Sequence, residues 1–342
     1  MTIDIFSTRA MLRALEERRA PKLFLTNTFF GTTETSDTEY VDIDVIRNKR
    51  RLAPFVHPLA EGKLMERQGY STKSFKPPYL KPKMVTTAAD LLKRSMGESV
   101  YSTKTPAQRA AEQLARDLAE MQDSIWRRIE WMAAQALFTD TITVTGEGVS
   151  ATINFGRDAA LELTLASGDK WDSASATILE DLRDWKSLVA QRTGLVPNVA
   201  IFGSDVVDAF LADNDVQAVL GRFHNLTVTA AMTTENLPDG VTYVGRVEGL
   251  DIFTYEEWYL DTDGVTERPM VPADKVLLAS TRARRAVHFG AILDLDANGV
   301  AAVPYWPKSW RTPDPSAQWV MLQSAPLVVP TQVDACLVAE VL

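Results

Sequence analysis

The chain has 342 residues, of which 46% are hydrophobic and 24% are charged, and its formal net charge at pH 7 is −9. These values are typical of a folded protein with a sizeable core, and the negative charge argues against a dedicated nucleic-acid binder. No segment approaches the roughly 20 consecutive apolar residues that cross a bilayer, and the single cysteine, Cys336, excludes an intrachain disulfide. We expect a protein kept in a cytosol, with Cys336 as a small apolar residue of a buried strand.

The first predicted element is a short helix within residues 7–19, for which Ser7 is a suitable N-cap. From Pro21 to Tyr40 no hydrophobic period is sustained, which indicates an arm over residues 1–38. Its apolar side chains need another surface to cover them; they are Leu23, Leu25, Phe29 and Phe30.

An open β-ribbon is predicted over residues 39–86. Apolar and polar residues alternate from Tyr40 to Ile46, as in a strand with two different faces. The prolines that follow cannot occupy the middle of a sheet; they are Pro54, Pro58, Pro77, Pro78 and Pro82. Because an isolated two-stranded ribbon is at best marginally stable, this segment needs a partner surface.

Positive charge is concentrated in and after this ribbon. Between Arg47 and Lys104 there are 13 lysines and arginines against 4 aspartates and glutamates, so this segment has a net charge of +9 and the rest of the chain −18. Two interpretations stay open. The basic residues form an ordinary solvated surface, or they lie on an acidic surface of their own subunit or of a neighbour.

The strongest local signal begins at Thr105. Thr105, Pro106 and Gln108 form a capping box with proline in the first turn, and the predicted helix runs from 106 to 138, about 50 Å in length. Apolar residues recur along one face at intervals of three and four; they include Leu114, Leu118, Met121, Ile125, Ile129 and Met132. We expect this face to pack on a sheet formed partly by residues 318–342. A coiled-coil dimer is the alternative.

A mixed α/β region is predicted after the long helix. Two strands surround a turn at Gly146–Gly148, and further along are a helix that Gly194 ends and a second helix that runs from its N-cap Ser204 to Leu220. The tryptophan- and proline-rich run at 304–319 is predicted to be an irregular crossover. The chain then returns as strands.

Two stretches match motifs of ligand binding in part, but the residues around them do not fit those motifs. Gly146–Ala151 matches the dinucleotide fingerprint in letters, but a strand pattern follows where the fingerprint requires a helix N-terminus. Asp294–Gly299 resembles the start of a calcium loop, whose closing position here is Tyr305 and not a carboxylate, so a polar turn is expected. We predict no catalytic residue, no cofactor and no metal site.

The segment Pro307–Val329, PKSWRTPDPSAQWVMLQSAPLVV, joins a Pro-Lys-x-Trp element to an apolar strand containing Gln-Ser-Ala-Pro-Leu. Upstream, in the same order, are Phe29–Phe30, the KPPYLKPK stretch from Lys76 to Lys83, and the long helix after TPAQR. Together these motifs resemble the lambda-like branch of the major capsid proteins of tailed bacteriophages.

The resemblance implies the Hong Kong 97 phage fold, an α+β architecture, and assigns a role to each segment. These are the N-terminal arm (1–38), the extended E-loop (39–86), the P-domain (87–175, with a spine helix at 105–138), the A-domain (176–303), and a crossover that returns to the P-domain (304–342). It also implies a virion shell of hexamers and pentamers around double-stranded DNA, assembled in the host bacterial cytoplasm. Expected partners are a separate scaffolding protein, a portal and a decoration protein, and no membrane.

Two sets of contact residues follow from these roles. The E-loop residues expected at intersubunit contacts are Arg47, Lys49, Arg50, Arg51, Phe55, Lys63, Leu64, Arg67, Phe75 and Tyr79. The crossover tryptophans, expected either in the core or between subunits, are Trp306, Trp310 and Trp319. An encapsulin-type cargo shell and a soluble α/β enzyme are the alternative functions.

Overall fold

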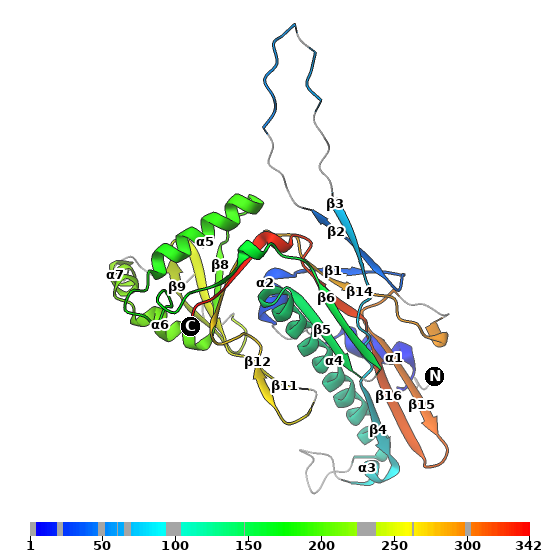
Figure 1. Cartoon of the computed structure of the whole chain (residues 1–342). Helices are drawn as coiled ribbons and strands as arrows, with labels where there is room; N and C mark the ends of the chain where they lie inside the picture. The colour runs from blue at the N-terminus through cyan, green and yellow to red at the C-terminus, as the bar shows by residue number, and fades with distance from the viewer. Residues whose placement is uncertain are drawn as a thin grey trace.

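The computed structural model describes residues 5–18, 23–46, 52–59, 61–64, 70–93, 104–146, 148–223, 237–261, 263–297 and 302–342. A long helix, α4 (Pro106–Phe138), runs through the middle of the molecule (Figure 1). A six-stranded sheet with its helices lies on one side of α4, and most of the remaining strands lie on the other (Figure 1).

Helix α4 begins with the capping box predicted from the sequence. The backbone N–H of Gln108 donates to Thr105 Oγ1 at 3.3 Å, and the backbone N–H of Thr105 donates to Gln108 Oε1 at 2.9 Å. Two of the backbone groups left unpaired at a helix end are thereby satisfied. The predicted helix at 106–138 is confirmed.

The apolar stripe of α4 is buried along its length. The six predicted core residues are each at most 7% exposed; they are Leu114, Leu118, Met121, Ile125, Ile129 and Met132. Helix α4 contacts β16 (Ala317–Gln323), β17 (Pro326–Val329) and β18 (Cys336–Glu340). Because strands of the same chain cover the stripe, as predicted, the helix needs no coiled-coil partner.

Two three-stranded sheets and two ribbons surround α4. One sheet has the order β15 (Trp306–Thr312), β16 and β4 (Lys83–Thr87), and the other has β1 (Thr32–Thr35), β14 (Ala286–Phe289) and β17. The ribbons pair β2 (Val41–Ile46) with β3 (Tyr70–Phe75), and β5 (Thr141–Gly146) with β6 (Val149–Asn154).

The prediction of an irregular crossover at 304–319 is wrong. Strands β15 and β16 form a regular antiparallel hairpin, in which Trp310 is paired with Trp319. Pro307 is compatible with this strand because β15 lies at the edge of its sheet, where a missing N–H leaves no ladder bond unmade.

The six-stranded sheet has the order β7, β18, β13, β8, β10, β9. The strands not yet placed are β7 (Glu162–Thr164), β13 (Lys275–Ala279), β8 (Val199–Phe202), β10 (Leu250–Tyr255) and β9 (Val241–Val247). Its helices are α5 (Ile178–Thr193), α6 (Ser204–Ala212) and α7 (Asn214–Phe223). Their shared core includes Trp171 and Trp185, whose rings stack with centroids 5.7 Å apart.

Two details of these helices differ from prediction. The N-cap of α6 is Gly203 and not Ser204. Position 203 requires glycine, because a Cβ there would lie 2.3 Å from the backbone oxygens of Pro272 and Ala273. The single helix predicted to Leu220 is broken at Asp213, whose Oδ1 accepts the N–H of Val216 at 2.8 Å. Gly194 ends α5 with φ 79°, as predicted.

The N-terminal segment contains α1 (Thr8–Glu16), α2 (Phe24–Phe29) and β1. Ser7 caps α1 as predicted, accepting the N–H of Ala10 at 3.4 Å. Helix α1 contacts β15 and helix α2 contacts α4. Its large apolar residues are at most 4% exposed; they are Phe24, Leu25, Phe29 and Phe30. The surface that these side chains need is therefore provided by the same chain.

The remaining elements are α3 (Ala88–Leu92), the hairpin of β11 (Trp258–Leu260) and β12 (Glu267–Pro269), and 3-10 helices at Ala159–Leu161, Leu295–Ala297 and Val333–Ala335. Cys336 is buried in β18, as predicted. Among the described residues, no helix is both long and apolar enough to cross a membrane.

Candidate assembly surfaces

The feature that extends furthest from the body is the projecting loop, which we define as residues 52–59 and 61–64, between β2 and β3 (Figure 1). It has no helix or strand. Four large apolar side chains on it are 92% to 105% exposed; they are Leu52, Phe55, Leu59 and Leu64. Since large apolar side chains rarely lie together in full contact with water, this loop is a candidate surface for contact with another molecule.

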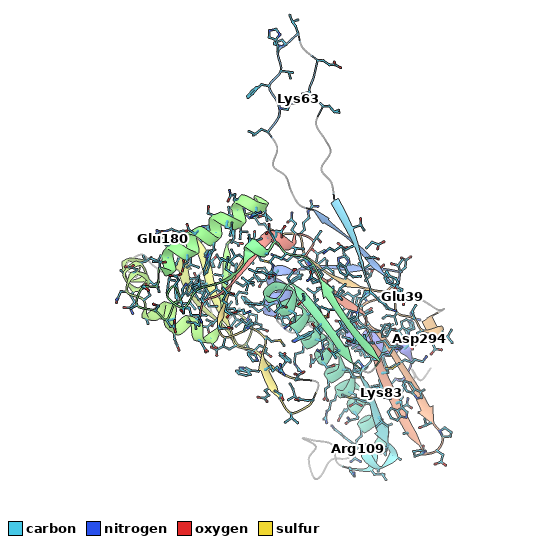
Figure 2. All side chains as sticks on the ribbon, in the orientation of Figure 1. Glu39, Lys63, Lys83, Arg109, Glu180 and Asp294 are labelled. Carbon is cyan, nitrogen blue, oxygen red and sulfur yellow. The ribbon has the colours of Figure 1, made fainter. Side chains whose placement is uncertain are left out.

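Of the basic residues predicted at intersubunit contacts, Lys63 is the one that lies within the described residues. Lys63 is exposed on the projecting loop (Figure 2). The other loop cations lie outside the described residues; they are Arg47, Lys49, Arg50, Arg51 and Arg67.

Two predicted contact residues lie at the base of the ribbon and contact their own chain. The ring of Phe75 lies 5.6 Å from that of Phe155, and the hydroxyl of Tyr79 donates to Gln323 Oε1 at 2.9 Å. Burial raises the pKa of Tyr79 to about 12, which keeps this hydroxyl a donor at neutral pH. Phe75 and Tyr79 therefore fix the base of the ribbon to the body of their own chain, and their contact with a neighbouring subunit stays a prediction.

The base of the ribbon is connected to a buried carboxylate in the predicted polar turn. Asp294 accepts from Lys308 Nζ at 2.9 Å and from Gln323 Nε2 at 2.6 Å. Since Gln323 also accepts from Tyr79, one network joins the ribbon base to β15 and β16. Within the described chain, Lys308 supplies positive charge to Asp294 and also lies 2.6 Å from Asp296.

The three predicted crossover tryptophans are all half-buried on the β15–β16 hairpin. Trp310 and Trp319 stack with centroids 6.2 Å apart and planes 8° apart, and Lys83 Nζ lies 5.4 Å from the Trp319 centroid. Cross-strand aromatic pairs and cation–π contacts of this kind stabilise a sheet. These contacts account for Trp310 and Trp319 within one chain.

A buried glutamate that sequence reasoning missed attaches the N-terminal segment to α4. The carboxylate of Glu130, 1% exposed, accepts from the backbone N–H of Leu25 at 2.7 Å, and from the N–H and hydroxyl of Thr26 at 3.0 and 2.6 Å. Burial raises the pKa of Glu130, while hydrogen bonds from Thr26, Leu25 and Tyr255 act in the opposite direction. Nothing in the sequence around Glu130 indicates that its partners are Leu25 and Thr26.

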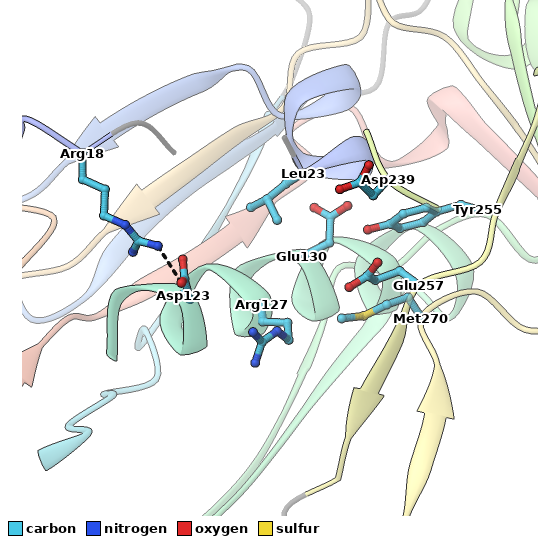
Figure 3. A pocket seen from close by; sticks show the side chains of 9 residues that line it. All are labelled: Arg18, Leu23, Asp123, Arg127, Glu130, Asp239, Tyr255, Glu257 and Met270. Atoms are coloured by element: carbon cyan, nitrogen blue, oxygen red, sulfur yellow. Dashed lines mark hydrogen bonds and ion pairs between the residues drawn. The ribbon is translucent and has the colours of Figure 1, made fainter. Parts of the chain in front are cut away.

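Beside Glu130 lies a cavity of about 340 Å³ (Figure 3). Its wall combines the N-terminal segment, α4 and the strand β10, and it includes the ion pair of Arg18 with Asp123 at 2.6 Å. Tyr255 and Glu257 line the opposite side (Figure 3). Within the described residues no group of three or more histidine, cysteine or acidic side chains is arranged to hold a metal ion. The cavity thus lies at the interface between the N-terminal segment and the body.

Comparison with known proteins shows that the chain is similar to phage head proteins over nearly its whole length. The chain is 27% identical to the P21 prophage-derived major head protein of Escherichia coli O6:H1 (strain CFT073), over 99% of this chain and 100% of that protein. It is 26% identical to the major capsid protein of Escherichia phage lambda, over 96% of each chain.

Solved structures show the same fold. The crystal structure of the putative capsid protein of a prophage of Escherichia coli CFT073 superposes with a TM-score of 0.72 at 21% identity, over 98% of this chain and 99% of that one. A phage-related protein from Bordetella bronchiseptica RB50 gives a TM-score of 0.54 at 12% identity, over 97% and 96% of the two chains. These matches confirm the predicted α+β capsid fold.

The family model described as phage major capsid protein E matches residues 7–341. This match covers nearly the whole chain and distinguishes the phage shell proteins from the encapsulin-type shell and the α/β enzyme that the sequence left as alternatives. The chain therefore belongs to the phage major capsid protein E family, the structural proteins of the phage head shell.

Proposed function

We propose that many copies of this chain form the icosahedral head shell of a tailed phage, in which the projecting loop of each copy lies on a neighbouring copy. The observation that carries this proposal is the full exposure of Leu52, Phe55, Leu59 and Leu64. Burying each such side chain is worth about 1.5–3 kcal/mol. Ordering a loop without secondary structure opposes this gain, so the contact must bury several of these residues at once.

The roles of the segments follow from this arrangement. Residues 1–38 act as the N-terminal arm, 39–86 as the E-loop, 87–175 with the return of 304–342 as the P-domain, and 176–303 as the A-domain around the axes of hexamers and pentamers. A heterologous contact, in which two different surfaces meet, is what allows one kind of chain to form a closed ring.

The partners proposed for the shell are a separate scaffolding protein, a portal and a decoration protein, with assembly in the host bacterial cytoplasm. The shell encloses double-stranded DNA without binding a particular sequence. The net charge of −9 supports this, because an acidic wall repels a polyanion and leaves the packaged DNA free to move.

Electron microscopy of the purified chain tests the function directly. The wild type should form closed shells, whereas a soluble enzyme would stop at a small oligomer on size-exclusion chromatography. A Leu52→Ser, Phe55→Ser, Leu59→Ser variant should stay folded by circular dichroism and lose assembly.

The matched control is Val196→Ser with Leu211→Ser, two residues 53% and 43% exposed outside the loop. Normal shells from the loop variant would refute the role of the loop. Failure of the wild type to assemble with or without scaffolding protein would refute the shell.

A further inference from the structure

The hairpin of β11 and β12 presents a second exposed apolar surface. Trp258, Leu260 and Val265 are 58%, 57% and 83% exposed. Trp258 is paired with Pro269 across the hairpin, and Pro269 is also exposed. Because residues two apart in a strand share a face, Trp258 and Leu260 form one apolar stripe beside Pro269.

The opposite face of this hairpin holds it to the body. Tyr259 lies between Trp258 and Leu260 in sequence and therefore points the other way. Its ring meets that of Trp131 of α4 edge to face, with centroids 6.4 Å apart. Arg268, paired with Tyr259, bonds Asp261 at 3.0 Å. The exposed stripe is therefore carried by a hairpin in a defined position.

The charge of the hairpin is opposite to that of residues 47–69, the segment that contains the projecting loop. Residues 256–269 hold five acidic side chains and one arginine, a net charge of −4, whereas residues 47–69 hold six basic and two acidic side chains, a net charge of +4. Glu256 and Glu267 are exposed and make no ion pair with another described residue. Complementary charge of this kind selects a partner and sets its register.

The two surfaces extend from different sides of the molecule. In Figure 1 the projecting loop leaves the body at the top, and β11 and β12 extend from the lower side of α4. The loop and the hairpin of one copy therefore do not contact each other, but the loop of one copy can contact the hairpin of a second copy.

We propose that the β11–β12 hairpin is the docking surface for the projecting loop of a second copy of this chain. The stripe of Trp258, Leu260 and Pro269 receives the apolar side chains of the loop, and Glu256 and Glu267 face its basic residues. This inference rests on the proposed shell function and names the surface on which the loop lies.

Crosslinking within assembled shells tests the pairing. The full chain with Phe55→Cys and Leu260→Cys is assembled and treated with a short bifunctional maleimide, while the native Cys336 is buried and stays unreacted. A loop-to-hairpin contact should give a ladder of covalent trimers and longer chains on a denaturing gel. Either cysteine variant alone should stop at dimers.

The control pair is Phe55→Cys with Val196→Cys, which places the second thiol on an exposed site outside the hairpin. An equal ladder from the control pair, or no ladder from shells that are intact in micrographs, would overturn the docking site while leaving the shell function in place. If the wild type forms no shells, the proposed function itself fails.

A charge-reversal experiment adds an independent readout. Glu256→Lys with Glu267→Lys should reduce the yield of shells most strongly at low salt, where repulsion from the basic loop is least screened. Glu180→Lys on α5 is the matched control and should assemble normally (Figure 2). Equal assembly of both variants at low salt would show that the hairpin does not face the loop.

Discussion

The N-terminal segment and the projecting loop share one sequence feature, but the first is buried against the body and the second is exposed. Both combine large apolar residues with no sustained hydrophobic period. In the first, Phe29 is 3% exposed against the body, and in the second, Phe55 is 105% exposed. The difference lies in the polar groups that fix the backbone.

The N-terminal segment is fixed because Glu130 accepts two of its backbone N–H groups and one hydroxyl. Arg18 adds a bond to Asp123 and another to the carbonyl of Ala119 at 2.7 Å. The projecting loop has prolines at positions 54 and 58, which remove backbone donors. An apolar segment thus joins its own core where polar partners satisfy its backbone, and otherwise stays available to another molecule.

The largest expected effect comes from the same substitution in both regions. Phe29→Ala should lower the free energy of unfolding by about 3–5 kcal/mol, because it leaves a cavity in a packed core. Phe55→Ala should leave the unassembled chain as stable as the wild type. Urea unfolding followed by circular dichroism measures both. Equal losses would mean that the loop also folds against its own chain.

A smaller loss is expected when the polar anchor is removed. Glu130→Ala leaves the N–H groups of Leu25 and Thr26 without their acceptor, and an unsatisfied buried donor costs about 1–3 kcal/mol. Glu112→Ala on the same helix removes a half-exposed ion pair with Lys104 and should cost about 0–1 kcal/mol. If the two variants are equally stable in urea, Glu130 does not anchor the segment.

The charge of Glu130 predicts a dependence on pH. Because burial raises the folded-state pKa of Glu130 above the ordinary value of 4.5, its contribution to stability is complete below that value and is lost as the pH rises through the folded pKa. The wild type should therefore lose stability relative to Glu130→Gln as the pH rises from 4.5 to neutrality. Urea midpoints of both proteins across this range provide the measurement. A shift of the opposite sign would show that the donors outweigh burial.

The smallest effect on stability is expected from the basic residues on and beside the projecting loop. Reversing Arg50, Arg51 and Lys63 to Glu should change the free energy of unfolding by less than about 0.5 kcal/mol, as is usual for surface substitutions. Assembly should nevertheless fail, most severely at low salt. Circular dichroism and electron microscopy of the triple variant separate the two outcomes. Normal shells at low salt would contradict a contact between the loop and an acidic surface.

Features with a local cause could be predicted from the sequence. The start of α4 follows from Thr105 and Gln108, and its buried face follows from the spacing of residues such as Leu118 and Ile125. The exposed ribbon follows from its prolines and basic residues. Each of these signals is contained within a few turns of helix or one strand pair.

Features that depend on residues far apart in the sequence could not be predicted from it. Glu130 is buried because of Leu25 and Thr26, about 105 residues away. Position 203, the N-cap of α6, requires glycine because the backbone of Pro272 and Ala273 leaves no room for a Cβ. The regular hairpin of β15 and β16 was not predicted, because the prolines in residues 304–319 favoured an irregular crossover over strands that pair with each other and with β4. In each case the partner is identified only by the fold.

The pairing of β1 with β14 has a consequence for the order of folding. It is a parallel pairing of Thr32–Thr35 with Ala286–Phe289, and it closes a loop of roughly 250 residues, so it forms late compared with α4 or the β15–β16 hairpin. Until then β1 has no strand beside it, and the segment is held by the bonds of Leu25 and Thr26 to Glu130 and by the packing of Phe24 on Phe253 and Tyr255. We therefore expect β1 to be among the last strands to pair. Chains that stall before this step leave one edge of β14 unpaired, and an unpaired strand edge is a site of aggregation.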